Sequence, residues 1–482
     1  MYGRSKLKEK CGIVGAYSYS GKTVMPIVMN SLKALQHRGQ ESWGVAAPDY
    51  PPYKKLGLVA EYNYDFVHVI QNIITPVAIG HVRYSTIGTS DFRNVQPIQI
   101  GDDFLIAHNG TITNSYELEK ALGHEFSTPT WVSDTHLVGL RLLQLLRRNN
   151  YDWFKSFEIL SGEIVGAYCF IILTKDGNIY AIRDGKGFRP LCIGKHKDTD
   201  SIIVASESCA LSITGAILER DINPGEIVKI NEDGIESYKF SEQSNHAHCA
   251  FEYTYFAHPS SYIEGKSVYA TRKNVGKMLA KRYHLEGDIV IPVPDSARPA
   301  ALGYYEESGI PFEEGLLKDR YGRRGGLRSF IQPSTQKRLE ITRMILPLIE
   351  AVRGKNIIVV DDSIVRGNSS KQIVRYLKNS GAKKISLLST FPPIIYACYA
   401  GIDFPTQKEL VAYQSGDNSQ NIDEINKRVA DIVKTEFVGY NDLDGLCEGI
   451  GLPKNELCTS CITGDYSCLK NKPKVDKKKL EK

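Results

Sequence analysis

The stretch Asn356-Ile-Ile-Val-Val-Asp-Asp-Ser-Ile-Val-Arg-Gly-Asn-Ser-Ser370 decides the fold of the second half of the chain. Its β-branched run predicts a buried strand of a parallel sheet. The strand ends in Asp361 and Asp362, at the sheet edge where ligands of open α/β folds bind. Two neighbouring carboxylates there can accept hydrogen bonds from vicinal hydroxyls or hold Mg²⁺. The residues from Arg366 to Ser370 offer backbone N–H groups, hydroxyls and a helix N-terminus to a phosphate, so the stretch indicates a sugar-phosphate site.

The same stretch resembles the phosphoribosyl-pyrophosphate (PRPP) signature of the type I phosphoribosyltransferases. An Asp-Asp pair alone could be a helix N-cap and a solvated neighbour, but the Arg-Gly-polar tail favours the phosphate site. No G-x-x-x-x-G-K-[ST] motif occurs, which excludes a Walker A loop. The resemblance implies that PRPP is bound by Asp361, Asp362, Ser363, Arg366, Gly367, Asn368, Ser369 and Ser370, with Asn368 and Ser369 standing where the family usually has two threonines.

A second predicted strand, Ile289–Val293, is followed by a turn that contains Asp295 and Ser296. In the family such a loop meets the pyrophosphate and its magnesium ion. The resemblance therefore implies that Asp295 and Ser296 also contact PRPP, and that one Mg²⁺ per subunit is bound by Ser296, Asp361 and Asp362. The basic, Gly-rich segment 318–333 has the composition of a mobile lid, with residues 321–330 disordered until PRPP binds.

The composition is that of a soluble globular protein, with 42% hydrophobic and 24% charged residues among 482, which is enough for two to four domains. No apolar run approaches the ~20 residues of a membrane helix, and no signal-peptide core is present, so we expect a cytoplasmic protein without membrane contacts. The net charge of +5 is small and much of it lies in the Lys-rich tail 470–482, which we expect to be disordered. It does not indicate nucleic acid binding.

The two halves of the chain have different patterns of predicted secondary structure. From Cys11 to about residue 240, short strands alternate with Gly-rich turns, and convincing helices are few, near Val28–Gln36 and Asp134–Arg148. This pattern predicts an antiparallel-rich α+β layer structure. After His246, strands alternate with helices, which predicts βαβ units and a parallel sheet, at Ile289–Val293 with Ala297–Ser308, Ile357–Val360 with Ser369–Ser380, and Lys384–Thr390.

Cys11 is the candidate nucleophile of the first half. Removal of residues 1–10 as a propeptide would give it a free α-amine, whose pKa near 8 suits a general base that takes the thiol proton. One residue would then supply both nucleophile and base. The alternative is a buried structural cysteine, which would be the better interpretation of Cys11 in isolation.

Five stretches together resemble the glutamine amidotransferase domain of the N-terminal-nucleophile (Ntn) class, whose hydrolase fold has four αββα layers: Cys11–Gly15, Gln36–Ser42, Gly80–Thr86, Ala107–Asn114 and Ser133–Thr135. The resemblance implies that Cys11 attacks glutamine, that Asn109 and the N–H of Gly110 form the oxyanion hole, and that Arg83 and Asp134 hold the α-carboxylate and α-amine of glutamine. Arg38 stands where the family has a loop that orders over bound glutamine. We interpret His37, His81 and His108 as structural.

Both halves, in this order, resemble the amidophosphoribosyltransferases, which open purine biosynthesis. Further matching stretches are Arg183–Leu191, Ala205–Ser208 and Phe251–Ala257. The resemblance implies a glutamine amidotransferase domain at 11–243 and a phosphoribosyltransferase domain at 244–469. It also implies glutamine and PRPP as substrates, internal passage of ammonia, purine nucleotides as feedback inhibitors and a homotetramer. Two alternatives stay open: a phosphoribosyl-binding regulator with an inactive first half, and an amidotransferase with another acceptor.

Ten cysteines in a chain expected in the cytosol argue against a disulfide framework. Cys458 and Cys461 form a C-x₂-C pair, and Cys249 and Cys398 could complete a site of four thiolates. This set resembles that of the [4Fe–4S] form of the family, with one cluster per subunit. Zinc is the alternative metal, because sequence spacing does not separate the two.

Overall fold

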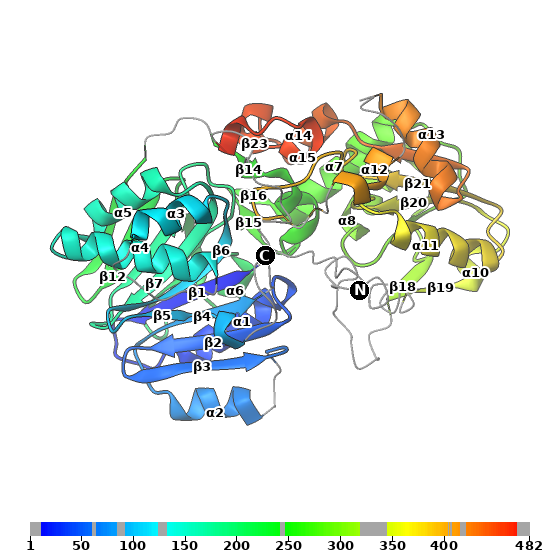
Figure 1. Ribbon diagram of the computed structural model, residues 1–482. Coiled ribbons are helices and arrows are strands. Elements are labelled where there is room, and N and C mark those ends of the chain that lie inside the picture. The colour runs from blue at the N-terminus through cyan, green and yellow to red at the C-terminus, as the bar shows by residue number, and fades with distance from the viewer. Residues whose placement is uncertain are drawn as a thin grey trace, which may run out of the picture.

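The computed structural model describes residues 11–59, 64–83, 92–123, 133–241, 246–318, 345–402, 404, 407–414 and 421–469. The first half of the chain forms the layered body on the left of Figure 1, and the second half forms the body on the right. The predicted propeptide 1–10, most of the predicted lid and the basic tail lie outside the described residues.

The first half is built on two antiparallel sheets. The first sheet has the strand order β11-β9-β10-β1-β4-β2-β3, formed by β1 (Gly12–Ser18), β2 (Ser42–Ala47), β3 (Tyr50–Leu56), β4 (Val77–Arg83), β9 (Cys192–His196), β10 (Ser201–Ala205) and β11 (Ile217–Asp221). The second sheet has the order β13-β12-β8-β7-β6-β5, formed by β5 (Ile98–Ile100), β6 (Phe104–Ile112), β7 (Gly166–Thr174), β8 (Ile179–Arg183), β12 (Glu226–Asn231) and β13 (Gly234–Lys239).

The alternation of buried side chains along the strands produces four layers. On β1, Ile13 packs between the two sheets, whereas Val14 packs against α1 (Met25–Ala34) on the outer face. On β6, Ala107 faces the other sheet and Ile106 faces the helices of the opposite outer layer. That layer contains α3 (Ser115–Leu122), α4 (Asp134–Arg148) and α5 (Trp153–Glu163), and the layer of α1 also contains α6 (Cys209–Ser212), with α2 (Tyr64–Asn72) beside α1.

The second half is built on a parallel sheet of order β17-β20-β21-β22, formed by β17 (Ile289–Pro292), β20 (Asn356–Asp361), β21 (Lys384–Ser389) and β22 (Phe437–Tyr440). Both faces are covered, as a parallel sheet requires. Val290 and Val360 pack against α7 (Val268–Arg282) and α8 (Arg298–Ser308), whereas Ile291 and Val359 pack against α11 (Asn368–Asn379) and α13 (Ile422–Val433).

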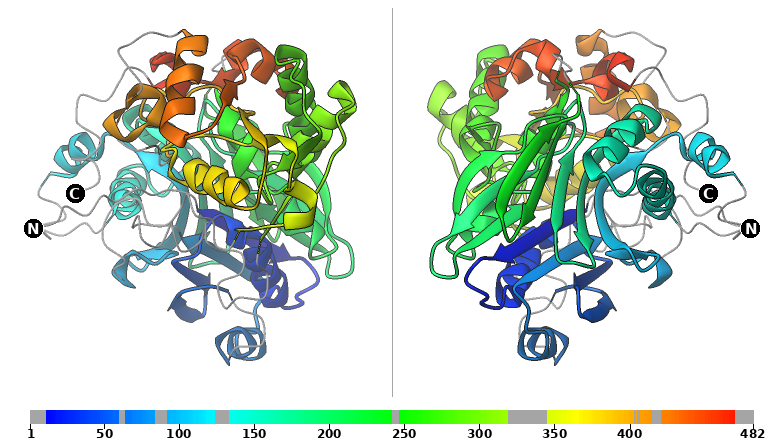
Figure 2. Two further views of the ribbon diagram at one scale, coloured as in Figure 1. Left: turned by 90° about the vertical axis from the view of Figure 1, so that its right-hand side faces the viewer. Right: turned by 90° about the vertical axis from the view of Figure 1, so that its left-hand side faces the viewer.

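Smaller elements complete the second half. Three short strand pairs are β14 (His248–Cys249) with β23 (Leu457–Cys458), β15 (Tyr262–Ile263) with β16 (Lys266–Ser267), and β18 (Leu316–Lys318) with β19 (Ile345–Pro347). The short helices are η3 (Glu252–Phe256), α10 (Ile349–Val352), η5 (Gln407–Glu409), α12 (Val411–Gln414), α14 (Leu443–Ile450), η6 (Lys454–Glu456), α15 (Ser460–Thr463) and η7 (Ser467–Leu469). The red C-terminal segment lies beside the green start of this half in Figures 1 and 2, because β23 pairs with β14.

Several predicted elements are confirmed. The helix expected at Asp134–Arg148 is α4 with the same bounds, and the expected strand at Ile357–Val360 is the centre of β20. The expectation of few helices in the first half was wrong, because α3 and α5 were not anticipated. In α5 the Asp152 cap and the spacing of the buried Phe157 and Leu160 are local helix signals.

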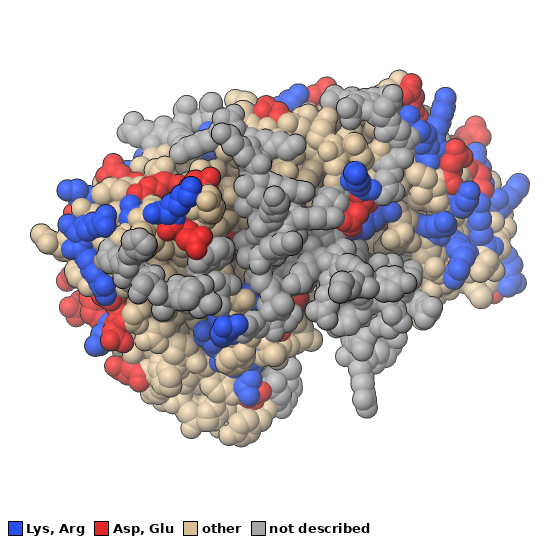
Figure 3. Space-filling view, viewed as in Figure 1, with Lys and Arg blue, Asp and Glu red and all other residues tan. Residues whose placement is uncertain are grey.

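Among the described residues, no helix has both the length and the apolar composition needed to cross a membrane. The cytoplasmic location expected from the sequence stays a prediction. On the face shown in Figure 3, Lys and Arg side chains are mixed with Asp and Glu over both halves.

Candidate active sites

The candidate nucleophile lies at one end of the first sheet. Cys11 immediately precedes β1 and is 8% exposed. β1 pairs with β4 so that Gly12 lies opposite Val82, which places Cys11 at the end of the sheet where Arg83 closes β4. The structure therefore brings the predicted nucleophile and the predicted carboxylate-binding arginine to the same edge.

Asn109 and Gly110 lie on β6 of the other sheet. A hydrogen bond between the His81 ring on β4 and the carbonyl of His108 on β6 joins the two strands. Asn109 is 1% exposed, and its Nδ2 has no hydrogen-bond partner among the described residues. A buried amide without a partner is costly unless a ligand satisfies it, so Asn109 fits an oxyanion donor. Gly110 has φ 149°, and a Cβ there would lie 2.0 Å from the carbonyl oxygen of Ala167, so only glycine fits.

Asp134 is the first residue of α4 and is 5% exposed. Its Oδ2 accepts a hydrogen bond of 3.1 Å from the N–H of Ile112, two residues after Gly110. This contact holds the carboxylate near the predicted oxyanion hole. Its role with the α-amine of glutamine stays a prediction, as does that of Arg83.

Of the histidines in the matched stretches, His81 and His108 are buried, and His37 is partly exposed. Burial lowers the pKa of His81 and of His108, although Asp134 opposes the shift at His108. His37 contacts the Glu207 carboxylate at 2.8 Å. These environments fit structural histidines rather than general bases poised near neutral pH.

The Arg38 guanidinium makes hydrogen bonds and ion pairs with other groups of the protein in this structure. Its Nε donates to the main-chain carbonyl of Cys11 at 3.0 Å, and its two Nη atoms pair with Glu207 and Glu252. The direct contact of Arg38 with glutamine therefore stays a prediction, while the observed contacts assign it to the support of Cys11.

The acidic pair lies at the carboxyl edge of the parallel sheet, as predicted. Asp361 and Asp362 are 7% and 6% exposed. Burial and the charge of Asp362 raise the pKa of Asp361 well above its usual range. Asp362 accepts hydrogen bonds from Ser363 at 2.8 Å and from Ser296, so the loop after β17 reaches the end of β20.

The remaining PRPP residues surround this edge. Asp295 is exposed and lies 3.6 Å from Arg298 and 4.0 Å from Lys318. Gly367, with φ 75°, precedes α11, whose first residues are Asn368, Ser369 and Ser370. Arg366 lies 3.5 Å from Glu409. A helix N-terminus beside two carboxylates suits a phosphate next to a metal-bound sugar.

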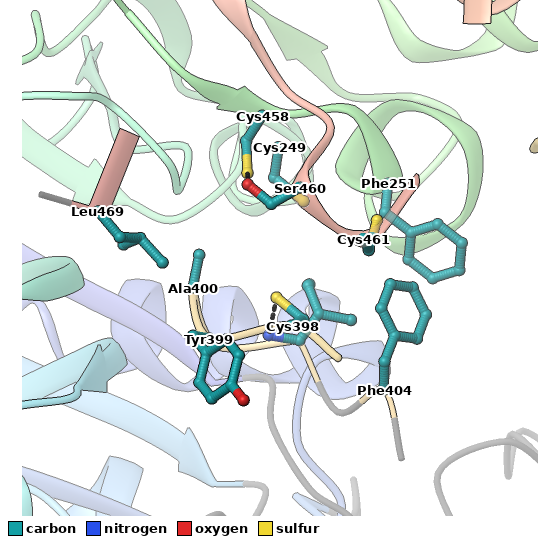
Figure 4. Close-up of a pocket in the computed structure, with 11 residues that line it drawn as sticks. Cys249, Phe251, Cys398, Tyr399, Ala400, Phe404, Cys458, Ser460, Cys461 and Leu469 are labelled. Carbon is teal, nitrogen blue, oxygen red and sulfur yellow. Dashed lines mark hydrogen bonds between the residues drawn. The ribbon is translucent and has the colours of Figure 1, made fainter. Parts of the chain in front are cut away.

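The four predicted ligand cysteines line one pocket, together with Phe251, Tyr399, Ala400, Ile402, Phe404, Ser460 and Leu469. Figure 4 shows their sulfur atoms facing a common space. Burial raises the pKa of the Cys461 thiol, and the proximity of Cys398, Cys458 and Cys249 raises it further. The N–H of Ile402 donates to the sulfur of Cys398 at 3.3 Å. Among the described residues, no group of three or more His, Cys, Asp or Glu is arranged to hold a metal ion.

The other cysteines lie outside the lining of this pocket. Cys169 and Cys192 are buried on β7 and β9, and Cys209 is buried on α6. Cys447 is outside the lining of the pocket, whereas the Cys468 sulfur lies 4.0 Å from that of Cys458.

Sequence reasoning missed three charged residues, Arg189, Glu207 and Glu252. Each lies inside a stretch that carried the family resemblance, but none has a role in a substrate motif, so it received no function. Their burial, at 2%, 1% and 1% exposed, is the signal that only the fold provides.

Comparisons with known proteins agree with both halves. Residues 81–212 match the family model of the glutamine amidotransferase domain. The amidophosphoribosyltransferase of Methanocaldococcus jannaschii is 39% identical to this chain in an alignment 490 positions long. The alignment covers 96% of this chain and 99% of that protein. The chain belongs to the amidophosphoribosyltransferase family.

Other amidophosphoribosyltransferases match over a similar length. The protein named so in Bacillus subtilis is 37% identical, covering 95% of this chain and 94% of its own. The solved structure of the Bacillus subtilis glutamine PRPP amidotransferase with ADP and GMP has a TM-score of 0.81 at 35% identity, covering 95% of this chain and 97% of that one. The predicted fold, an Ntn hydrolase αββα domain followed by a type I phosphoribosyltransferase domain, is confirmed.

Proposed function

We propose that the chain transfers the amide nitrogen of glutamine to PRPP with the consumption of one water molecule, giving 5-phosphoribosylamine, glutamate and pyrophosphate in the first committed step of purine biosynthesis. The main support for the proposal is that one chain contains two separate sets of active-site residues. The Cys11 end of the layered half has the donors for amide cleavage, and the Asp361–Asp362 edge suits a sugar phosphate. The names of relatives at 37–39% identity support the same reaction.

At the first site, the Cys11 thiolate attacks the glutamine amide carbon. With residues 1–10 removed, the α-amine of Cys11 takes the thiol proton and later gives a proton to the departing ammonia. A water molecule then hydrolyses the glutamyl thioester at Cys11, which releases glutamate and restores the thiol. The Nδ2 of Asn109 and the N–H of Gly110 stabilise the oxyanion. Arg83 and Asp134 hold the substrate by its α-carboxylate and α-amine.

At the second site, ammonia displaces pyrophosphate from C1 of PRPP. Asp361 and Asp362 bind the ribose hydroxyls, and the N-terminus of α11 with Arg366 binds the 5-phosphate. Ser296, Asp361 and Asp362 would hold Mg²⁺, which would neutralise the departing pyrophosphate when bound. The burial of the adjacent Asp361 and Asp362 carboxylates supports a cation there, because a divalent ion removes the repulsion between two buried negative charges.

We also propose that Cys249, Cys398, Cys458 and Cys461 hold a [4Fe–4S] cluster, whose role is to tie the C-terminal segment to the junction. Four thiols facing one pocket, with an N–H donated to one sulfur, fit such a cluster. A single zinc ion draws its four sulfurs to about 2.3 Å from one point. The lining of one pocket by all four thiols supports a common metal centre, and the choice of a cluster over zinc follows the family resemblance.

The inactive-regulator alternative is disfavoured. A chain that only bound a phosphoribosyl group would have no use for an unpartnered Asn109 amide, a glycine at φ 149° and a cysteine at the start of β1. An amidotransferase with another acceptor is disfavoured by the Asp361–Ser370 stretch at the edge of a parallel sheet.

Three further parts of the proposal rest on the family. The domain boundary near 243 fits the gap between β13 and β14. Feedback inhibition by purine nucleotides is supported by the relative solved with ADP and GMP. The homotetramer is proposed from the resemblance alone.

The test is a split of two activities. Cys11→Ala protein should lose glutamine-dependent formation of phosphoribosylamine and keep ammonia-dependent formation from PRPP with Mg²⁺. Intact-mass measurement of the same preparation would report whether residues 1–10 are removed. Equal loss with both nitrogen donors would reject the assignment of separate sites.

A further inference from the structure

A continuous path of buried polar contacts leads from Cys11 into the second half of the chain. Arg38, which follows the short helix η1 (Leu35–His37), donates from Nε to the main-chain carbonyl of Cys11 at 3.0 Å. Its Nη2 lies 2.7 Å from Oε1 of Glu252, and its Nη1 lies 3.0 Å from Oε2. The two parallel contacts form a bidentate pair, the strongest geometry for arginine and carboxylate.

The path continues from Glu252 to the loop of a predicted metal ligand. Arg189 places Nη1 at 3.0 Å from Oε1 of Glu252 and donates from Nη2 to the carbonyl of Ala400 at 3.0 Å. Ala400 lies two residues after Cys398, and both line the cysteine pocket. One carboxylate from the second half thus joins two arginines from the first half.

Every charged member of the path is secluded from water. Arg38, Arg189 and Glu252 are at most 2% exposed. Burial by itself would raise the pKa of Glu252, but Arg38 and Arg189 hold it below its usual range, so the carboxylate stays charged. Removing one partner of such a group leaves an uncompensated buried charge and forces the neighbours to rearrange.

We propose that Glu252 and Arg189 are positioning residues for glutamine cleavage: they fix Arg38, and through it the main-chain carbonyl of Cys11. The carbonyl, the α-amine and the thiol of Cys11 share one Cα, so a rotation at the carbonyl turns the base and the nucleophile away from Asn109. A displacement of about 1 Å can cost ~100-fold in rate. The alignment of the nucleophile therefore depends on contacts made by the second half. This inference rests on the proposed function of Cys11.

The structure provides a matched control. Glu264 of the second half pairs with the buried Arg183 of the first half at 2.7 Å, and Arg183 holds it below its usual pKa range. This pair crosses the same junction, but among the described residues Glu264 pairs with Arg183 and His248 rather than with Arg38 or Cys11. Glu264→Gln therefore removes a comparable carboxylate without loosening the support of the nucleophile.

The experiment compares Glu252→Gln and Glu264→Gln in the full chain, purified anaerobically with its metal centre. For Glu252→Gln we expect kcat for glutamine hydrolysis to fall at least tenfold. KM for glutamine should stay within about twofold, since Arg83 and Asp134 are untouched. Ammonia-dependent synthesis and iron content should match the wild type.

Alkylation of Cys11 by iodoacetamide should slow together with kcat in the same variant. Glu264→Gln should keep kcat, and Glu252→Asp should recover part of the loss.

If Glu252→Gln does not fold, Arg189→Lys is measured in its place. It keeps the charge but loses the simultaneous contacts to Glu252 and Ala400, so kcat should fall with KM unchanged. Wild-type kcat in these variants, or an equal loss in Glu264→Gln, would overturn the inference. Failure of the proposed function looks different, because the wild-type protein would then show no glutamine-dependent synthesis.

Discussion

The hydroxyl of Ser296 donates a hydrogen bond to the carboxylate of Asp362, which joins the loop after β17 to the end of β20. Two segments separated by 66 residues thereby present their polar groups at one sheet edge. Parallel strands make this convergence possible, because their carboxyl ends lie side by side.

Asp362→Asn should lose PRPP turnover by about 100-fold or more, with glutamine and with ammonia alike, because both nitrogen donors react with the same PRPP. Ser296→Ala should lose about tenfold, equivalent to ~1.4 kcal/mol, because only one contact of the carboxylate is removed. Steady-state assays with each donor measure both losses. Near-normal turnover of Asp362→Asn would exclude this carboxylate as a PRPP or Mg²⁺ ligand.

Asp361→Asn should stabilise the ligand-free protein while it abolishes turnover. The pKa of Asp361 is raised in the fold, so its ionised form opposes folding. That penalty is absent below the unfolded pKa near 4 and grows as the pH rises toward the folded pKa. The melting temperature of Asp361→Asn should therefore exceed that of the wild type by a margin that widens from pH 4 to neutral pH. A margin that is constant with pH would contradict the assignment of a raised pKa.

Asn109→Ala should lower kcat for glutamine hydrolysis by about 100- to 1,000-fold, the usual effect of losing one oxyanion donor, with little change in KM. Asn114→Ala is the control, because among the described residues its side-chain amide bonds to main-chain groups, at Glu163 and Val165. This control should lower the melting temperature and keep kcat. If the two variants lost activity equally, the unpartnered amide of Asn109 would not be the oxyanion donor.

Single substitution of each pocket cysteine by serine should deplete the iron of anaerobically purified protein, which we expect to be about four per chain in the wild type. The substituted positions are Cys249, Cys398, Cys458 and Cys461. Cys447→Ser and Cys468→Ser should keep the iron and the brown colour, since neither side chain lines the pocket. Colourless wild-type protein with one zinc per chain would decide for the other metal.

The sequence by itself determined the fold class and most of the candidate site residues. Asp361 and Asp362 follow a β-branched run, and Asn109 and Gly110 stand in a short polar motif, so each could be read from its immediate neighbours. Local patterns of this kind report strand ends, turns and helix starts because backbone geometry is set by adjacent residues. They also carried the family resemblance.

Only the tertiary structure decided how the two halves are joined. Arg38 and Glu252 are 214 residues apart, and neither residue's neighbours predict a buried pair between them. Likewise, sequence spacing alone did not show that Cys249, Cys398, Cys458 and Cys461 meet, whereas the fold places all four around one pocket. Such contacts depend on packing between distant segments, because that packing excludes water from them. The strength of each charge interaction rises when water is excluded, so it is a property of the whole fold.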